Sequence, residues 1–119
     1  MKKQTVSSLE KKLSDVNLTG VDLSLRDVIE CIADGFRIES MRFITPDPKY
    51  ELDGLYCNDY GKKEILINSE TNLDTKRVSA IHELYHYVFD KMGIEQNEIA
   101  VEYLAQKKFI ELYKHTPDE

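Results

Sequence analysis

The sequence predicts an α+β fold, in which a small and mostly antiparallel sheet packs on a central helix and on a C-terminal helix. Short apolar segments separated by turn residues occupy the middle of the chain, as in small sheets. Apolar residues at helical spacing follow them through the last third. A length of 119 residues is sufficient for one hydrophobic core but not for two. We therefore expect residues 1–119 to form a single domain.

Two helices are expected in the first third of the chain. Residues 1–20 are polar and are the least determined part of the prediction, with a short helix expected from Val6 to Leu13. Ser24 is a good N-cap for a second helix, which should end at Gly35. The apolar residues of this second helix recur at helical spacing and are expected to pack into the core: Leu25, Val28, Ile29, Ile32 and Ala33.

Three strands are expected in the middle of the chain. The first covers residues 37–44 and is stopped by the prolines that follow it. The other two cover residues 50–57 and 63–68, and Gly61 between them suits a hairpin turn. The edge of such a sheet can pair with an extended peptide, or the chain itself can cover it.

Two long helices complete the prediction. The central helix should begin near a cap at Asn72 or Asp74 and end at Gly93. Its expected core residues are Val78, Ile81, Tyr85, Val88 and Met92. The last helix should run from about Glu95 to Tyr113. Its expected core residues are Val101, Leu104, Ala105, Phe109 and Leu112.

The central helix carries the sequence H-E-x-x-H at His82, Glu83 and His86. Residues four apart lie on one face of a helix, about 6 Å apart along its axis, so both histidines can bind one metal ion. Glu83 lies beside that face and can take a proton from water at the open position of a zinc ion. The alternative is that both histidines lie on a solvated face, as we expect of His115 in the polar C-terminal segment.

A catalytic zinc ion usually has three protein ligands, so one is missing from this motif. Asp90 is one turn past His86 on the same helix and is poorly placed to complete a tetrahedron. The last helix offers Glu98 and Glu102, and a turn at Gly93 would bring it back antiparallel to the first. One register sets Glu98 opposite His86 and Glu102 opposite His82, and another sets Glu102 opposite His86. We predict that Glu98 is the ligand and that Glu102 accepts a hydrogen bond from a histidine N–H. In the alternative, both glutamates face solvent near a helix N-terminus, which favours negative charge.

Three segments of the chain resemble the ImmA/IrrE family of small metallopeptidases, which are often associated with phages or mobile elements. These segments are a G-x-Y strand at Asp53 to Tyr56, an I-x-x-N strand at Glu64 to Asn68, and the H-E-x-x-H helix from Lys76 to His86. The resemblance covers residues of about 53–105. It implies a metallopeptidase fold, a bound zinc ion, and a third zinc ligand that is a glutamate on a later helix. The sequence from Asn97 to Glu102 is also similar to the glutamate-bearing helix of thermolysin-like gluzincins.

Composition narrows the possible partners. The formal charge is −6, and the basic residues are scattered, which disfavours a nucleic-acid-binding surface. No apolar run approaches the ~20 residues of a membrane span, and the N-terminal residues lead into no signal-peptide core. We therefore expect a cytoplasmic protein with no membrane or nucleic-acid partner. Cys31 and Cys57 are expected to be reduced thiols outside any zinc site.

The leading functional hypothesis is a zinc-dependent peptidase that acts on a cellular or phage regulatory protein, such as a repressor. Zn²⁺ held by His82, His86 and Glu98 would polarise the scissile carbonyl, and Glu83 would pass a proton from water to the leaving amine. The substrate would lie along the edge of the strand over residues 50–57. The side chains available as a further donor to the oxyanion are three tyrosines, none of them preferred: Tyr56, Tyr60 and Tyr85.

Two other hypotheses remain open. In the first, the chain is a catalytically silent binding or regulatory module that keeps the metallopeptidase scaffold, with structural zinc or none. In the second, it is a structural α+β domain whose histidines are coincidental, and it binds no metal. Bound metal and chelator-sensitive cleavage distinguish the three hypotheses.

Overall fold

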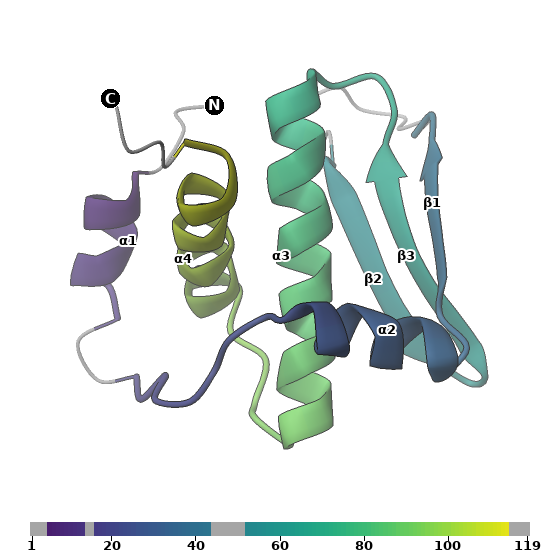
Figure 1. Cartoon of the computed structure of the whole chain (residues 1–119), viewed down its shortest axis with the longest axis horizontal. Coiled ribbons are helices and arrows are strands. Elements are labelled where there is room, and N and C mark those ends of the chain that lie inside the picture. Colours follow the sequence, from purple (N-terminus) through teal and green to yellow (C-terminus); the bar gives the residue numbers. More distant parts are fainter. Residues whose placement is uncertain (1–4, 14–15, 44–51, 115–119) are drawn as a thin grey trace.

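The computed structural model describes residues 5–13, 16–43 and 52–114, and it confirms the α+β class. One long helix, α3, lies between a helical layer formed by α1 and α4 and a layer formed by a three-stranded sheet, while α2 crosses on one side (Figure 1). The elements in chain order are α1 (Val6–Lys11), α2 (Leu25–Ala33), β1 (Arg37–Met41), β2 (Gly54–Asp59), β3 (Lys62–Asn68), α3 (Leu73–Met92) and α4 (Glu98–Phe109), followed by a π-helical segment (Ile110–Lys114).

The sheet has the order β1-β3-β2 and is mixed. The predicted hairpin forms, with β2 antiparallel to β3 and Tyr56 opposite Ile65. Its two-residue turn has positive φ angles at Tyr60 (47°) and Gly61 (80°), which match the twist of the flanking strands. The remaining pair, β1 with β3, is parallel. Among the described residues, strand β2 therefore forms one edge of the sheet, on the opposite side from β1.

The helix boundaries follow their capping residues. The Asn72 side chain accepts a hydrogen bond from the backbone N–H of Thr75 (2.8 Å), so it caps α3 as predicted. Gly93 ends α3 in the left-handed conformation, with φ of 69°. The last helix begins later than predicted, because the Asn97 side chain caps it by accepting from the N–H of Ala100 (3.1 Å). Glu98 is consequently the first residue of α4.

Helix α3 contributes to two hydrophobic clusters, one on each side. Toward α4 the cluster includes Tyr85, Phe89 and Val101. Toward the sheet it includes Ile65 and Tyr87. Because both sides are covered, the middle of α3 is buried around most of its circumference, and the H-E-x-x-H residues lie in this part.

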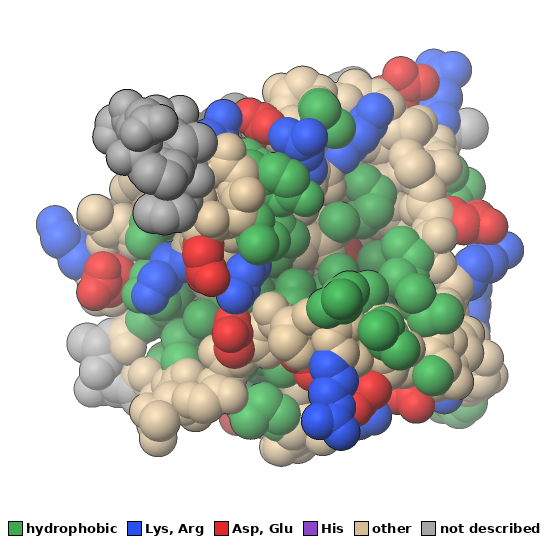
Figure 2. Space-filling model, viewed as in Figure 1, with side chains coloured by type: hydrophobic (Ala, Val, Ile, Leu, Met, Phe, Trp, Pro, Cys, Tyr) green, Lys and Arg blue, Asp and Glu red, His purple; other side chains and the backbone are tan. Residues whose placement is uncertain are grey.

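Some predicted core residues are exposed, and the largest error concerns α2. Its apolar stripe is open to solvent, with exposed fractions of 75% for Leu25, 58% for Ile29 and 57% for Ile32, and Figure 2 shows hydrophobic side chains gathered over this helix. The helix packs instead through Cys31, which is fully buried in the cluster on the sheet side. Hydrophobic periodicity identifies an apolar face but not the face that meets a neighbour.

Two further core predictions were wrong because the residues lie at the ends of their helices. Met92 occupies the last turn of α3 and is 49% exposed, and Leu112 lies in the π-helical segment beyond α4 and is 57% exposed.

Other predictions concern the cysteines, membrane spans and residues outside the described ranges. The side chains of Cys31 and Cys57 are free thiols, as predicted. Among the described helices, none is both long and apolar enough to cross a membrane. The residues Tyr50, Pro46, Pro48 and His115 lie outside the described part of the chain.

Candidate metal centre

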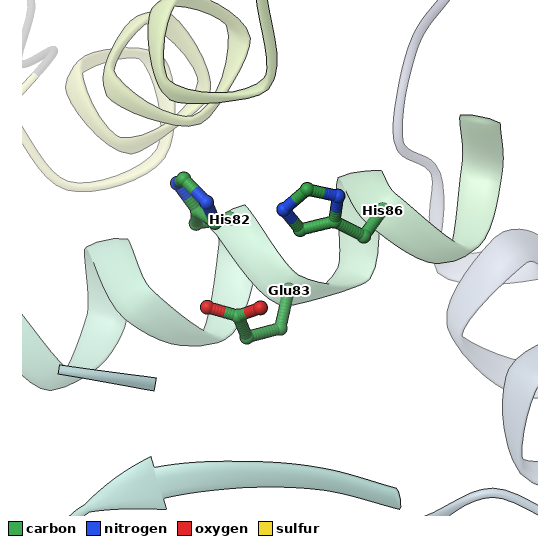
Figure 3. A group of neighbouring side chains, drawn as sticks. All are labelled: His82, Glu83 and His86. Carbon is green, nitrogen blue, oxygen red and sulfur yellow. The ribbon is translucent and has the colours of Figure 1, made fainter. Parts of the chain in front are cut away.

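The H-E-x-x-H residues lie together in the middle of α3. One ligand atom from each of His82, Glu83 and His86 lies within 4.8 Å of the other two, which makes the group a possible metal site. The two imidazole rings are 5.0 Å apart between centroids. Figure 3 shows the rings on one side of the helix and the Glu83 carboxylate on the side that faces the strands. The arrangement is the one that the i, i+4 spacing predicts.

Glu98, on the neighbouring helix α4, contacts both histidines of α3. Its Oε1 lies 2.7 Å from His86 Nε2, and its Oε2 lies 3.0 Å from His82 Nε2. The turn at Gly93 and the cap at Asn97 return the chain so that the first turn of α4 lies beside the middle of α3. The structure thus brings together the side chains predicted as metal ligands, from two successive helices.

The other nitrogen of each ring also has a partner. His82 Nδ1 donates to Glu102 Oε1 (2.7 Å), and the second oxygen of Glu102 accepts from Gln106 Nε2 (2.7 Å). His86 Nδ1 donates to Gln96 Oε1 (2.7 Å). Glu102 therefore lies against His82, as in the first of the two predicted registers. Sequence reasoning missed Gln96, because a glutamine in a short connection between helices carries no pattern that marks it.

Each imidazole ring consequently has an acceptor beside both of its nitrogens. A neutral imidazole has a single N–H, so it can donate to only one of two acceptors. The short contacts from the two Nε2 atoms to Glu98 therefore need either additional protons or a cation between the nitrogens and the carboxylate. Two imidazole nitrogens and one carboxylate form a donor set found in catalytic zinc sites. The residues present fit a zinc ion.

The distances are also close to those of a metal site. Two ligand atoms of a tetrahedral zinc ion lie about 3.3 Å apart, given bonds of about 2.0–2.1 Å. The Glu98 oxygens are 2.7 and 3.0 Å from the two ring nitrogens, so they need to withdraw by only tenths of an ångström. The Glu98 side chain is 72% exposed and can make this movement without disturbing the core.

Burial dominates the electrostatics of Glu83. The residue is only 6% exposed. Burial raises the pKa of its carboxyl to about 7; the nearby His82 opposes this, and the negative charges of Glu98 and Glu102 add to it. For His82, burial favours the neutral ring. The hydrogen bond to Glu102 and the surrounding carboxylates outweigh burial, so the pKa of His82 is raised.

Strand β2 approaches Glu83 closely at Gly54. A Cβ atom on Gly54 would lie 2.8 Å from Glu83 Oε2 and 3.2 Å from its Cγ, well inside van der Waals contact. Only glycine leaves room for the carboxylate in this position. Sequence reasoning assigned no role to Gly54 beyond its place in a motif, because a glycine in a strand does not reveal what lies above it.

The three tyrosines considered as oxyanion donors are engaged elsewhere or lie at the surface. Tyr56 donates to Asp90 Oδ2 (2.6 Å), and Tyr85 lies 3.3 Å from Asp22 Oδ1. Tyr60 is fully exposed at the hairpin turn. Asp90, which the sequence predicted to be poorly placed as a metal ligand, accepts hydrogen bonds from Tyr56 and from Gln96.

Comparison with known proteins identifies the family. A family model described as the IrrE N-terminal-like domain, of peptidase family M78, matches residues 40–111, which is more than half of the chain. No curated protein and no solved structure is significantly similar to the chain. The match spans β2, β3, α3 and α4, and the two helices among them carry the histidines and glutamates described above. The chain belongs to the IrrE N-terminal-like family of M78 metallopeptidases.

Proposed function

We propose that the chain is a zinc-dependent peptidase that hydrolyses a peptide bond in a regulatory protein. The observation that carries this proposal is the position of the Glu98 carboxylate against the Nε2 atoms of His82 and His86, with Glu83 beside the same two rings. Membership of a metallopeptidase family supports it independently.

The proposed zinc ligands are His82 Nε2, His86 Nε2 and the Glu98 carboxylate. They leave one position open, as in catalytic rather than structural zinc sites. When bound, zinc polarises the scissile carbonyl and lowers the pKa of a water molecule to about 7. The hydrogen bonds at the two Nδ1 atoms support this assignment, because they keep the protons on those nitrogens and leave the Nε2 lone pairs for the metal.

Glu83 is proposed as the general base and then the general acid. Its carboxylate would accept a proton from the attacking water and deliver it to the leaving amine. In the metal-free chain, burial raises the pKa of the Glu83 carboxyl to about 7, which is typical of carboxyl groups at catalytic sites. Such a group typically contributes about 10²- to 10⁴-fold in rate.

The substrate is proposed to bind as an extended segment along β2. This strand lies at the edge of the sheet, and its Gly54 is in contact distance of Glu83. Backbone pairing with β2 would bring a peptide bond toward the carboxylate. The resemblance to the ImmA/IrrE family further suggests a cytoplasmic regulatory protein, such as a phage or mobile-element repressor, as the substrate.

A silent binding module is the second candidate, and one observation favours it. The hydroxyls of Tyr56 and Tyr85 are turned to carboxylates and Tyr60 lies at the hairpin tip, so no tyrosine among these three supports the oxyanion. Such a module would bind a partner and zinc without turnover.

Substitution of Glu83 by Gln separates the two candidates. A quenched-fluorescence peptide library and purified candidate repressors serve as probes, with and without a chelator. The peptidase proposal expects chelator-sensitive cleavage by the wild type, and loss of cleavage with retained zinc in Glu83→Gln. An unchanged cleavage rate in Glu83→Gln would reject the mechanism. Stoichiometric zinc with tight repressor binding and no turnover in the wild type would favour the module.

A further inference from the structure

Gln96 lies in the short connection between α3 and α4 and reaches back onto α3. Its side-chain amide makes three hydrogen bonds. Oε1 accepts from His86 Nδ1 (2.7 Å), while Nε2 donates to the backbone carbonyl of His86 and to Asp90 Oδ1 (both 2.9 Å). All three bonds join it to the last turns of α3. Although Gln96 is exposed, its amide is held at three points.

These bonds determine which way the amide faces. Nε2 lies beside a carbonyl oxygen and a carboxylate oxygen, and both can only accept. A flipped amide would place its oxygen against these two acceptors. Oε1 must therefore face His86, so Nδ1 of that ring carries a proton. This leaves Nε2, which lies 2.7 Å from Glu98 Oε1, as the ring nitrogen available to a metal.

A second contact holds the same ring from its face. Tyr56 on β2 stacks on His86, with ring centroids 5.8 Å apart and an angle of 20° between the planes. The Tyr56 hydroxyl donates to Asp90 Oδ2 (2.6 Å), and the other Asp90 oxygen accepts from Gln96. Gln96, Asp90 and Tyr56 thus form a closed set of contacts around His86, contributed by three different elements.

We infer that Gln96 is a positioning residue that fixes the tautomer and the orientation of His86 as a metal ligand. The inference rests on the proposed metal site. It also distinguishes the two histidines, because His82 Nδ1 is held by the carboxylate of Glu102 whereas His86 Nδ1 is held by a neutral amide. Loss of the amide leaves the ring free to carry its proton on Nε2, the tautomer that cannot bind the metal.

Zinc affinity tests this role without any assay of cleavage. Zn²⁺ is titrated into metal-free protein in competition with a chromophoric chelator. Gln96→Leu keeps the shape of the side chain and removes its hydrogen bonds, so affinity should fall by about 10- to 100-fold, as for other partners of metal-binding histidines. The matched control is Glu95→Leu, which places the same side chain at the preceding exposed position and should bind zinc as the wild type does.

A double substitution tests the hydrogen bond itself. Gln96→Glu combined with Asp90→Asn supplies a carboxylate acceptor to His86 Nδ1 and an amide that can donate to this carboxylate. One carboxylate oxygen still faces the backbone carbonyl of His86, so the variant should recover part of the lost affinity. Thermal unfolding of the metal-free variants should match that of Glu95→Leu, which separates a local effect on the ring from a folding defect.

Nitrogen NMR of the imidazole rings gives a readout that a merely structural role would not move. In zinc-loaded wild type, His86 should carry its proton on Nδ1, and metal-free Gln96→Leu should gain the Nε2–H tautomer. Equal zinc affinity in Gln96→Leu and Glu95→Leu would overturn the inference while leaving the metal site intact. A proton on Nε2 in the loaded wild type would overturn both the inference and the assignment of that nitrogen as a ligand. Failure of the wild type itself to take up zinc would overturn the metal site and this inference together.

Discussion

Substitution of Gly54 by Ala tests whether strand β2 holds the proposed general base in position. The new Cβ would lie 2.8 Å from Glu83 Oε2, 3.2 Å from Cγ and 3.3 Å from Cδ. Non-bonded carbon atoms normally lie about 3.5–4.0 Å apart, so the end of the Glu83 side chain must retreat by about half an ångström or rotate away. The backbone of Gly54 has no positive φ, so the effect comes from space and not from backbone strain.

The expected loss falls on catalysis and not on stability. Glu83 is a flexible side chain, and alanine in a strand is favoured over glycine by about 0.5–1 kcal/mol, so the free energy of unfolding should change by less than about 1 kcal/mol. A misplacement of about 1 Å in a reacting group can cost about 10²-fold in rate, so kcat/KM should fall by about 10- to 100-fold. Zinc affinity should be unchanged, because the proposed ligands are on α3 and α4.

A double-mutant cycle identifies the cause. The cleavage rate of a library-derived fluorogenic peptide is measured for wild type, Gly54→Ala, Glu83→Gln and the double variant. If Gly54 acts through Glu83, the alanine substitution should have little effect once Glu83 is replaced. An undiminished rate in Gly54→Ala, or the same loss in both backgrounds, would refute the reasoning.

Three further predictions follow from the site and the fold. Glu98→Gln should lower zinc affinity by more than about 100-fold, because a residue that only orients a ligand contributes about 10- to 100-fold. Chelator competition measures the affinity, with Glu95→Gln as the control, and equal affinities of the two variants would remove Glu98 from the ligand set. Between pH 4.5 and about 7 the folded, metal-free chain keeps a proton on Glu83 that the unfolded chain has lost, so the free energy of unfolding should fall as pH rises through this window. The fall is on the order of 3 kcal/mol at most, and denaturant titrations should find it reduced in Glu83→Gln, whereas an unchanged slope would place that proton elsewhere. Ile29→Ser on the exposed stripe of α2 should change stability by less than about 0.5 kcal/mol, whereas Cys31→Ser in the core should cost about 1–3 kcal/mol; the reverse order in thermal unfolding would contradict the packing of α2.

Local chemistry made much of the site predictable. Helix ends depend on single residues whose type indicates a cap or a stop, as at Ser24, Asn72 and Gly93, so they could be predicted from the sequence. The spacing of His82 and His86 determines that they share a helix face. One short turn between two helices then limits the partners to a few glutamates, and the pairing of Glu102 with His82 follows one of the two registers expected.

Features that depend on contacts between distant segments were not predictable. The parallel pairing of β1 with β3 is invisible in the sequence of either strand. The orientation of α2 depends on the fit of Cys31 into the cluster on the sheet side, although a stronger apolar stripe lies elsewhere on the helix. The roles inferred for Gln96 and Gly54 arise from what each one touches across the fold, and neither residue type signals such a contact by itself.

The central claim is that side chains from two successive helices converge to hold one zinc ion. The most direct test is elemental analysis of the full chain purified without added zinc, for the wild type and for His86→Ala. We expect stoichiometric zinc in the wild type and loss of most of it in the variant. A wild-type chain that carries no zinc and takes none up, or a His86→Ala chain that retains it, would contradict this account.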